Sequence, residues 1–140
     1  MKIAVIDGQG GGIGRVIVEK LRQAGDSSYE IIALGTNALA TTIMLRAGAN
    51  VGSTGENAIV YNAARVDIIA GSVACLNANS YGGELSPRMA EAISASPALK
   101  VLIPLNRNGI YIAGTVDEPL PRQVDGLVEL VGAISAGQVR

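Results

Sequence analysis

The sequence predicts a three-layer α/β fold with a doubly wound, mostly parallel sheet and one antiparallel edge strand. Three observations predict it. Short apolar runs alternate with segments of helical periodicity, a cluster of glycines follows the first run, and an Asn-Gly pair follows the last run. At 140 residues the chain suits one hydrophobic core, so we expect a single domain over residues 1–140.

The first part of the chain predicts strand, helix and strand. Residues 2–7, KIAVID, are an apolar run ended by glycine, which is typical of a strand buried on both faces of a parallel sheet. Apolar residues at helical spacing predict a helix over 12–24, with Gly25 as its stop signal. A second apolar run predicts a strand over 29–34.

Two helices follow, each with a capping signal. Thr36 or Asn37 can cap the first, ALATTIMLRA, whose lack of a polar face indicates burial on two sides. Ser53 and Glu56 have the spacing of a capping box, Ser-x-x-Glu, and predict a second helix over about 55–65. The residues between the two helices are expected to form a loop.

The second half begins with a third strand over 67–71 and an irregular or partly helical crossover over 72–83. Ser86 followed by Pro87 is a strong start signal for a helix, because serine caps and proline needs no hydrogen-bonded amide at the first helical position. A fourth strand is expected over 100–106.

The last part of the chain predicts a hairpin and a helix. Asn108-Gly109 supplies the two positive φ values of a type I′ turn, so residues 110–114 are expected to return antiparallel beside the fourth strand. A final helix is expected over about 120–134.

The charge balance is nearly neutral, with 11 basic and 12 acidic residues. Without a basic cluster, nucleic acid is not an expected partner. Charged residues make up only 16% of the chain and apolar residues 49%, which leaves little polar cover for the surface. We therefore expect part of that apolar surface to face another copy of the chain in a homo-oligomer.

The uncharged stretches are shorter than a membrane span needs and contain polar residues, so no membrane association and a cytoplasmic location are expected. The chain has no histidine and one cysteine, Cys75. This excludes an internal disulfide, the usual imidazole or thiolate metal sites, and Ser/His/Asp or Cys/His nucleophilic machinery. No metal site and no catalytic residue are assigned.

Such a Rossmann-like arrangement collects ligands at the carboxyl ends of its strands, where the strand order reverses beside the first strand. Four segments should arrive there: residues 7–14, 35–37, 71 onward and 106–108. The residues expected to bind a ligand are Asp7, Gly8, Gln9, Gly10, Gly11, Gly12, Ile13, Gly14, Thr36, Asn37, Gly71, Ser72 and Asn106.

The glycine-rich turn DGQGGGIG over residues 7–14 is the most informative stretch. Glycines let a backbone approach a diphosphate closely, and the free amides and dipole of the following helix attract anions. The turn therefore predicts a site for a phosphate-bearing ligand, a nucleotide or dinucleotide such as NAD(P). The alternative is a tight strand-to-helix connection with close helix packing.

Gly8, Gly12 and Gly14 make Gly-x-x-x-Gly-Ile-Gly, which resembles the cofactor fingerprint of short-chain dehydrogenases. That resemblance implies a turn that cradles cofactor phosphates. The Tyr-x-x-x-Lys pair that is catalytic in those enzymes is absent. Where an acidic residue after the second strand would hold an adenosine ribose, this chain has residues 35–37, Gly-Thr-Asn.

Taken whole, the chain resembles a family of short bacterial proteins classified only as a domain of unknown function. The match lies in IAVIDGQGGGIG, ALGTNALAT, AGANVGSTGENAI and LIPLNRNGI. It implies no activity. The segment DGQGGG also resembles the Asp-x-His-x-x-Gly motif of cobalamin-binding domains, but Gln9 replaces the histidine that would ligate cobalt.

Several side chains keep two interpretations. The carboxylate of Asp7 would repel a phosphate unless a metal ion, a sugar hydroxyl or the amides of the turn itself engage it. Thr36 and Asn37 can contact a ribose or base, or only cap a helix. Cys75 is either a small core residue or a catalytic thiol. Four other polar sets can join the site or have ordinary surface roles: residues 53–57, Asn77, the Asn79-Ser80 pair and Arg107.

These observations leave two main functions open. The first is a nucleotide- or dinucleotide-binding protein, with or without catalysis, that uses the turn over residues 8–14. The second is a non-catalytic oligomeric sensor or assembly module whose anion site regulates association. Cobalamin-type binding without a histidine ligand is a weaker alternative.

Overall fold

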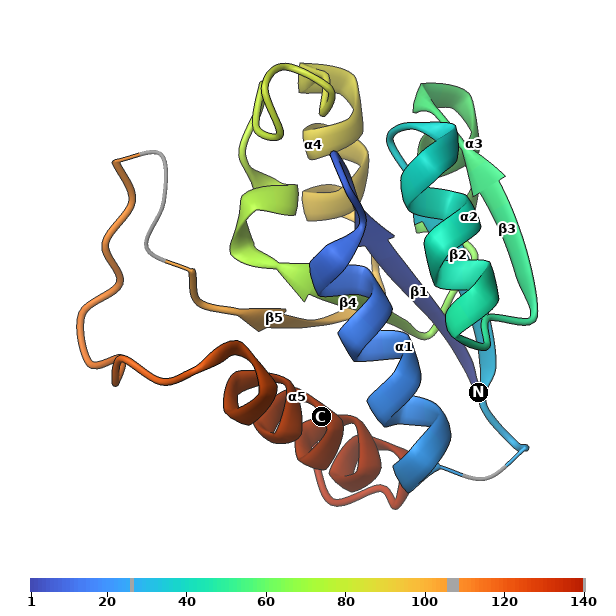
Figure 1. Ribbon diagram of the computed structural model, residues 1–140, viewed down its shortest axis with the longest axis vertical. Helices are drawn as coiled ribbons and strands as arrows, with labels where there is room; N and C mark the ends of the chain where they lie inside the picture. Colours follow the sequence, from blue (N-terminus) through green and yellow to red (C-terminus); the bar gives the residue numbers. More distant parts are fainter. Residues whose placement is uncertain (26, 106–108, 140) are drawn as a thin grey trace.

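The computed structural model describes residues 1–25, 27–105 and 109–139. Its centre is a five-stranded parallel sheet of order β3-β2-β1-β4-β5 (Figure 1). The strands are β1 (Lys2–Asp7), β2 (Glu30–Gly35), β3 (Val51–Thr54), β4 (Ile68–Ser72) and β5 (Leu99–Ile103). The helices are α1 (Gly12–Ala24), α2 (Ala38–Ala47), α3 (Glu56–Ala63), the 3₁₀ helix η1 (Val73–Leu76), α4 (Pro87–Ala95) and α5 (Leu120–Ser135). The predicted Rossmann-like α/β fold is confirmed.

Helices cover both faces of the sheet (Figure 1). One apolar cluster joins the sheet to α1, α2 and α5, and includes Ile17, Met44 and Val124. The other joins it to α3 and α4, and includes Ile59 and Ile93. Burial of these two faces is the main favourable contribution to folding, because apolar surface leaves water on both sides of the sheet.

The central strand β1 positions the glycine-rich turn. It pairs with β2 along its whole length and with β4 at Ile3, Ala4 and Val5. The chain winds outward through β2 and β3 on one side of β1, then returns to β4 and β5 on the other. The strand order therefore reverses at β1, so the turn after Asp7 opens at the edge where ligands of such folds collect.

The structure contains one strand that the sequence pattern did not predict, and one predicted helix cap is wrong. Residues 51–54, VGST, form the parallel edge strand β3, not a loop. Ser53 is part of that strand, and the N-cap of α3 is Gly55 without a side-chain cap. The segment is short, polar and mostly exposed, so it lacks the apolar pattern that predicts a strand, and pairing with β2 determines its structure.

The predicted antiparallel edge strand over 110–114 is wrong, because these residues form turn and irregular structure. β5 ends at Ile103, before Pro104, which has no amide hydrogen to donate to a sheet. An Asn-Gly pair makes a hairpin only when strands flank it, and within the described residues the last strand ends at Ile103. Asn108 itself lies outside the described residues.

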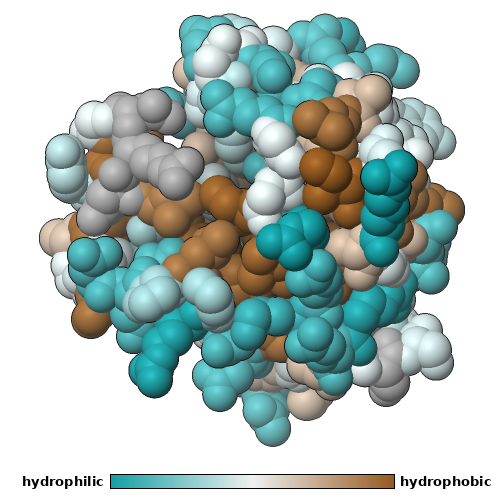
Figure 2. All heavy atoms as spheres, in the orientation of Figure 1, coloured by the Kyte–Doolittle hydropathy of each residue, from teal (hydrophilic) through white to brown (hydrophobic). Residues whose placement is uncertain are grey.

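The predicted two-sided burial of α2 is also wrong. Only Ala40, Thr41 and Met44 of this helix are buried, whereas the side chain of Leu39 is 59% exposed. Figure 2 shows hydrophobic side chains on this face of the molecule, in the area of α2 and across the middle of the face.

Within the described ranges, no helix is long and apolar enough to cross a membrane.

Candidate functional site

The buried carboxylate of Asp7, at the end of β1, holds the glycine-rich turn together. Its Oδ1 accepts a hydrogen bond of 2.8 Å from the amide of Gly8, and its Oδ2 one of 2.6 Å from the amide of Gly14. Asp7 is only 4% exposed. Of the interpretations open in the sequence, the carboxylate thus engages the amides of the turn, where it also faces the positive end of the α1 dipole.

Three glycines of the turn are required by the fold. A Cβ on Gly8 would lie 2.7 Å from Oγ1 of Thr36, and one on Gly14 would lie 2.5 Å from Sδ of Met44. Gly11 has a φ of 70°, in the left-handed region, and a Cβ there would lie 2.9 Å from the backbone of Ala40. Close packing and backbone conformation therefore explain these three positions.

Gly10 and Gly12 are different, because both are exposed and a Cβ on either would meet no atom within 4 Å. Neither has a positive φ. Across residues 1–25, 27–105 and 109–139, the amides of Gly10, Gly12 and Ile13 donate no hydrogen bond. The start of α1 thus presents open donors beside two glycines that the fold does not require.

Hollows lie on both sides of this helix start. On the side of α2, a hollow of about 260 Å³ is lined by Gly10 and Gly12 together with the guanidinium-bearing Arg15 and Arg46. On the side of β4, a hollow of about 120 Å³ is lined by residues from the turn and the start of α1, from β4 and the segment after it, and from the segment after β5. These residues are Gln9, Ile13, Ser72, Ala74, Tyr81, Gly82 and Leu105.

The β4-side hollow borders a larger one of about 300 Å³, since Ile13 and Leu105 line both. The larger hollow extends toward the start of α5, where Gln123 contributes to its wall. Among the described residues, Oε1 of Gln123 is a buried side-chain atom without a hydrogen-bond partner. It is an acceptor with free capacity at this wall.

Thr36 and Asn37 follow β2 and meet the glycine-rich turn through a residue that the sequence did not indicate. Oε1 of Glu84 accepts hydrogen bonds from the amide of Gln9 at 2.8 Å, from Oγ1 of Thr36 at 2.7 Å and from Nδ2 of Asn37 at 3.0 Å. The side-chain Nδ2 of Asn37 also donates to the backbone carbonyl of Gln9 at 3.0 Å. Glu84 carries no motif, so no local signal could have placed it here.

The three donors stabilise the ionised form of Glu84. The backbone amide of Gln9, then the hydroxyl of Thr36, lower the pKa of this carboxyl below its usual value. Asn37 has a second role as the N-cap of α2, where its Oδ1 accepts from the amide of Ala40 at 2.9 Å. The predicted cap is therefore confirmed for Asn37.

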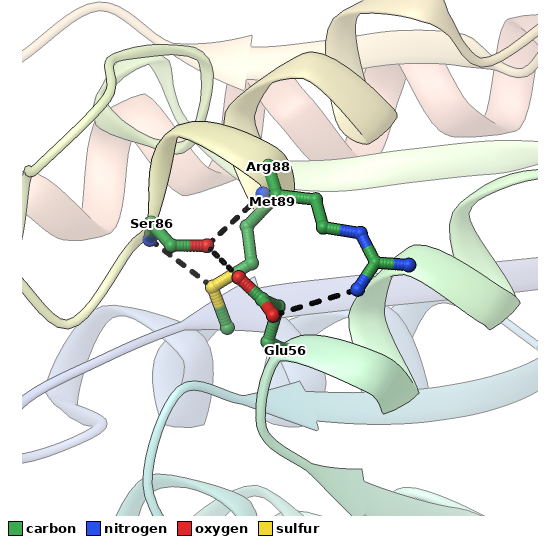
Figure 3. Close-up of polar contacts among 4 residues, drawn as sticks. All are labelled: Glu56, Ser86, Arg88 and Met89. Carbon is green, nitrogen blue, oxygen red and sulfur yellow. Dashed lines mark hydrogen bonds and ion pairs between the residues drawn. The ribbon is translucent and has the colours of Figure 1, made fainter.

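The loop that carries Glu84 is fixed at both ends. Backbone bonds link Asn79 to Leu85 at 2.7 Å and Leu85 to Ser80 at 3.1 Å, and the Leu85 side chain is fully buried. After it, Ser86 caps α4 and donates a hydrogen bond of 2.6 Å to Glu56 of α3 (Figure 3). The carboxylate of Glu84 is thus presented by a well-anchored loop.

The same loop contains one residue in a strained conformation. Asn79 and Tyr81 have φ values of 68° and 57°, in a left-handed region that asparagine tolerates but that a bulky residue such as tyrosine rarely adopts. Strain of this kind persists only where the surrounding structure imposes it, and it is frequent at functional sites. The hydroxyl of Tyr81 lies 3.3 Å from that of Ser72, at the β4-side hollow.

The remaining predicted site residues have mixed positions. Ser72 ends β4 and caps η1 through the amide of Ala74, at the edge of the β4-side hollow. Gly71 instead packs against β1, where a Cβ would lie 2.9 Å from the carbonyl of Ile6. Asn106 and Arg107 lie outside the described residues.

Cys75 is a core residue. Its side chain is fully buried in the cluster between the sheet and α4, and burial raises the pKa of its thiol to about 12. A thiol with this pKa is protonated at neutral pH, which contradicts the catalytic interpretation.

Within the part of the chain that the structure describes, no group of three or more His, Cys, Asp or Glu side chains could hold a metal ion.

A protein-family model matches this chain. The model of the family described as "Domain of unknown function (DUF3842)" matches residues 2–136, nearly the whole chain. No curated protein matches the chain.

Proposed function

We propose that this chain, which belongs to the DUF3842 family, binds a nucleotide or dinucleotide whose phosphates lie against the open amides at the start of α1. A cofactor of the NAD(P) type is one such ligand. No catalytic step is proposed, because no catalytic residue is assigned at this site.

One observation carries the proposal: Gly10 and Gly12 are glycines that neither packing nor backbone conformation requires. A tight connection between β1 and α1 accounts for Gly8, Gly11 and Gly14 but not for these two. Close approach of a ligand accounts for both, since a side chain at either position would occupy the space in front of the free amides.

Electrostatics supports an anionic ligand. The nearby carboxylate of Asp7 is engaged by two amides of the turn, and the open donors lie at the positive end of α1. Two cations, Arg15 and Arg46, and one carboxylate, Glu19, line the hollow beside Gly10 and Gly12. Arg15 is paired with Glu19 at 3.0 Å on the surface, an interaction weak enough for a phosphate to replace.

The size of the hollows supports a ligand larger than inorganic phosphate. The β4-side hollow of about 120 Å³ and its neighbour of about 300 Å³ meet at Ile13 and Leu105. Together they fall within the range of small-molecule sites, roughly 300–1,000 Å³. The free acceptor Oε1 of Gln123 suits a ligand with an N–H or O–H donor at that end.

The test is a thermal-shift and calorimetric screen of NAD, NADP, ATP, GTP, FAD and cobalamin. A ligand at 100 times its dissociation constant adds about 2.7 kcal/mol of stability. Gly12→Asp is expected to abolish binding without unfolding the protein, because its Cβ meets open space and a carboxylate at the first helical turn is favourable. Gly126→Asp, at an equally open position in α5, is the matched control. Unchanged affinity in Gly12→Asp would exclude this site.

A second candidate function is an oligomeric sensor or assembly module. The observation that favours it is the exposure of apolar side chains at one edge of the sheet, where Leu45 of α2 is 39% and Val51 of β3 is 51% exposed. β3 is an edge strand with one unpaired side, so a second copy can extend the sheet there. If the protein forms oligomers and none of the nucleotides shifts its melting temperature, this function is favoured over nucleotide binding.

A further inference from the structure

We propose that Glu84 is the residue that recognises the ribose of the bound nucleotide, as an acceptor for its 2′,3′-diol. This inference rests on the proposed function and names the ligand more closely: a nucleotide with free ribose hydroxyls, not one that carries a 2′-phosphate.

The first support is the position of the carboxylate. In dinucleotide-binding sheets an acidic residue after the second strand holds the ribose hydroxyls, and this chain has Thr36 and Asn37 there. Glu84 comes from a different part of the chain, yet its Oε1 lies 2.7 Å from Oγ1 of Thr36 and 3.0 Å from Nδ2 of Asn37. The fold thus places a carboxylate where the sequence lacks one.

The second support is the way its two oxygens are used. Oε1 takes all three hydrogen bonds, including the one from the amide of Gln9, which ties the carboxylate to the glycine-rich turn. Among the described residues, Oε2 of Glu84 has no hydrogen-bond partner, and the side chain is exposed. One oxygen is therefore fixed by the protein while the other is free to accept from a ligand hydroxyl.

The third support is the rigidity of the loop. Leu85, next to Glu84, is fully buried, and backbone bonds within residues 79–85 close the loop on itself. Ser86 then caps α4 and binds Glu56, whose carboxylate also lies 3.6 Å from Arg88 (Figure 3). A carboxylate held in this way is preorganised, so little conformational freedom is lost when a ligand binds.

The chemistry follows from the charge. The three donors keep the carboxylate ionised, and an ionised carboxylate has only acceptor capacity. It can accept hydrogen bonds from a vicinal diol, and it repels a phosphate on the same ribose. The site should therefore prefer ribonucleotides over 2′-deoxynucleotides, and NAD over NADP.

The test compares four probes by isothermal titration calorimetry: ADP, 2′-deoxy-ADP, NAD and NADP. Loss of a hydrogen bond to a charged group corresponds to about tenfold in affinity, so ADP should bind about tenfold more tightly than 2′-deoxy-ADP. In Glu84→Gln, the affinity ratios of ADP to 2′-deoxy-ADP and of NAD to NADP should both fall toward one. Glu91→Gln, at an exposed position of α4, should retain both preferences.

A second variant tests the position of the Glu84 carboxylate without a substitution in its own loop. Thr36→Val removes one of the three donors that hold the carboxylate and should shift the same ratios in the same direction, by less. Unchanged ratios in Glu84→Gln, while Gly12→Asp still abolishes binding, would overturn the role of Glu84 and leave the proposed function standing. Tighter binding of all four probes to Glu84→Gln would also overturn it, because the carboxylate would then be a competitor of the ligand. If none of the probes binds, both proposals fail.

Discussion

The carboxylate of Asp7 and the amide of Gly14 are joined by a buried hydrogen bond of 2.6 Å that spans the whole glycine-rich turn. The same carboxylate binds the amide of Gly8 at 2.8 Å. Asp7 therefore holds both ends of the turn, whereas the amides of Gly10, Gly12 and Ile13 donate no hydrogen bond to the described residues.

This arrangement predicts that Asp7 is important for stability. Asp7→Ala should lower the free energy of unfolding by about 2–4 kcal/mol, because it leaves two amides without their charged acceptor. Urea denaturation at neutral pH measures the change. Asp117→Asn, at an exposed position, should stay within about 0.5 kcal/mol of wild type. A loss below 1 kcal/mol in Asp7→Ala would contradict the role given to the carboxylate.

Gly11 and Gly12 should respond in opposite directions to alanine. Gly11→Ala forces a side chain into a left-handed conformation and against the backbone of Ala40, so a loss of about 1–3 kcal/mol is expected. Gly12→Ala should be neutral or stabilise by about 0.4–1 kcal/mol, since its Cβ meets no atom and the unfolded chain becomes less flexible. Denaturation curves of the two variants, measured side by side, check both signs. Equal losses would mean that Gly12 is also required by the fold.

Glu84 should contribute pH-dependent stability. Hydrogen bonds from Gln9 and Thr36 lower its folded pKa, whereas the unfolded value stays near 4.5. The contribution is therefore present above the unfolded pKa and is lost as the pH falls through the folded pKa. The difference in urea midpoint between wild type and Glu84→Gln should be larger at pH 7 than at pH 3. A difference that grows in acid would show that the sign is wrong.

Cys75 should be unreactive in the native protein. Its thiol is fully buried, with a pKa raised to about 12, so the reactive thiolate is scarce and inaccessible at pH 8. Labelling with a thiol reagent such as dithionitrobenzoate should be complete within minutes in denaturant and far slower without it. Rapid stoichiometric labelling of the folded protein would be incompatible with this burial.

The exposed apolar edge predicts self-association. Size-exclusion chromatography with light scattering should detect an oligomer, and Val51→Lys should shift it toward monomer, because a charge on an edge strand opposes further pairing. Val116→Lys, which also alters an exposed apolar residue but in the segment before α5, is the matched control. Wild-type protein that is monomeric at high concentration would reject the oligomer.

Local patterns in the sequence were sufficient for most of the architecture. Strand β1, helix α1 and the capped start of α4 at Ser86 and Pro87 were all predicted, because burial periodicity and helix caps act between residues a few positions apart. The location of the candidate site at the glycine-rich turn was predicted in the same way, although ligand binding there stays a prediction.

Only the tertiary structure decided how the polar groups around the turn are used. Glu84 is 75 residues from Gln9 and 48 from Thr36 in the chain, and the polar strand β3 exists through its pairing with β2. Such contacts depend on which segments the packed sheet brings together, and no short-range pattern encodes them. The distinction between the glycines that the fold requires and Gly10 and Gly12 arises in the same way, because only neighbouring atoms determine whether a side chain has room.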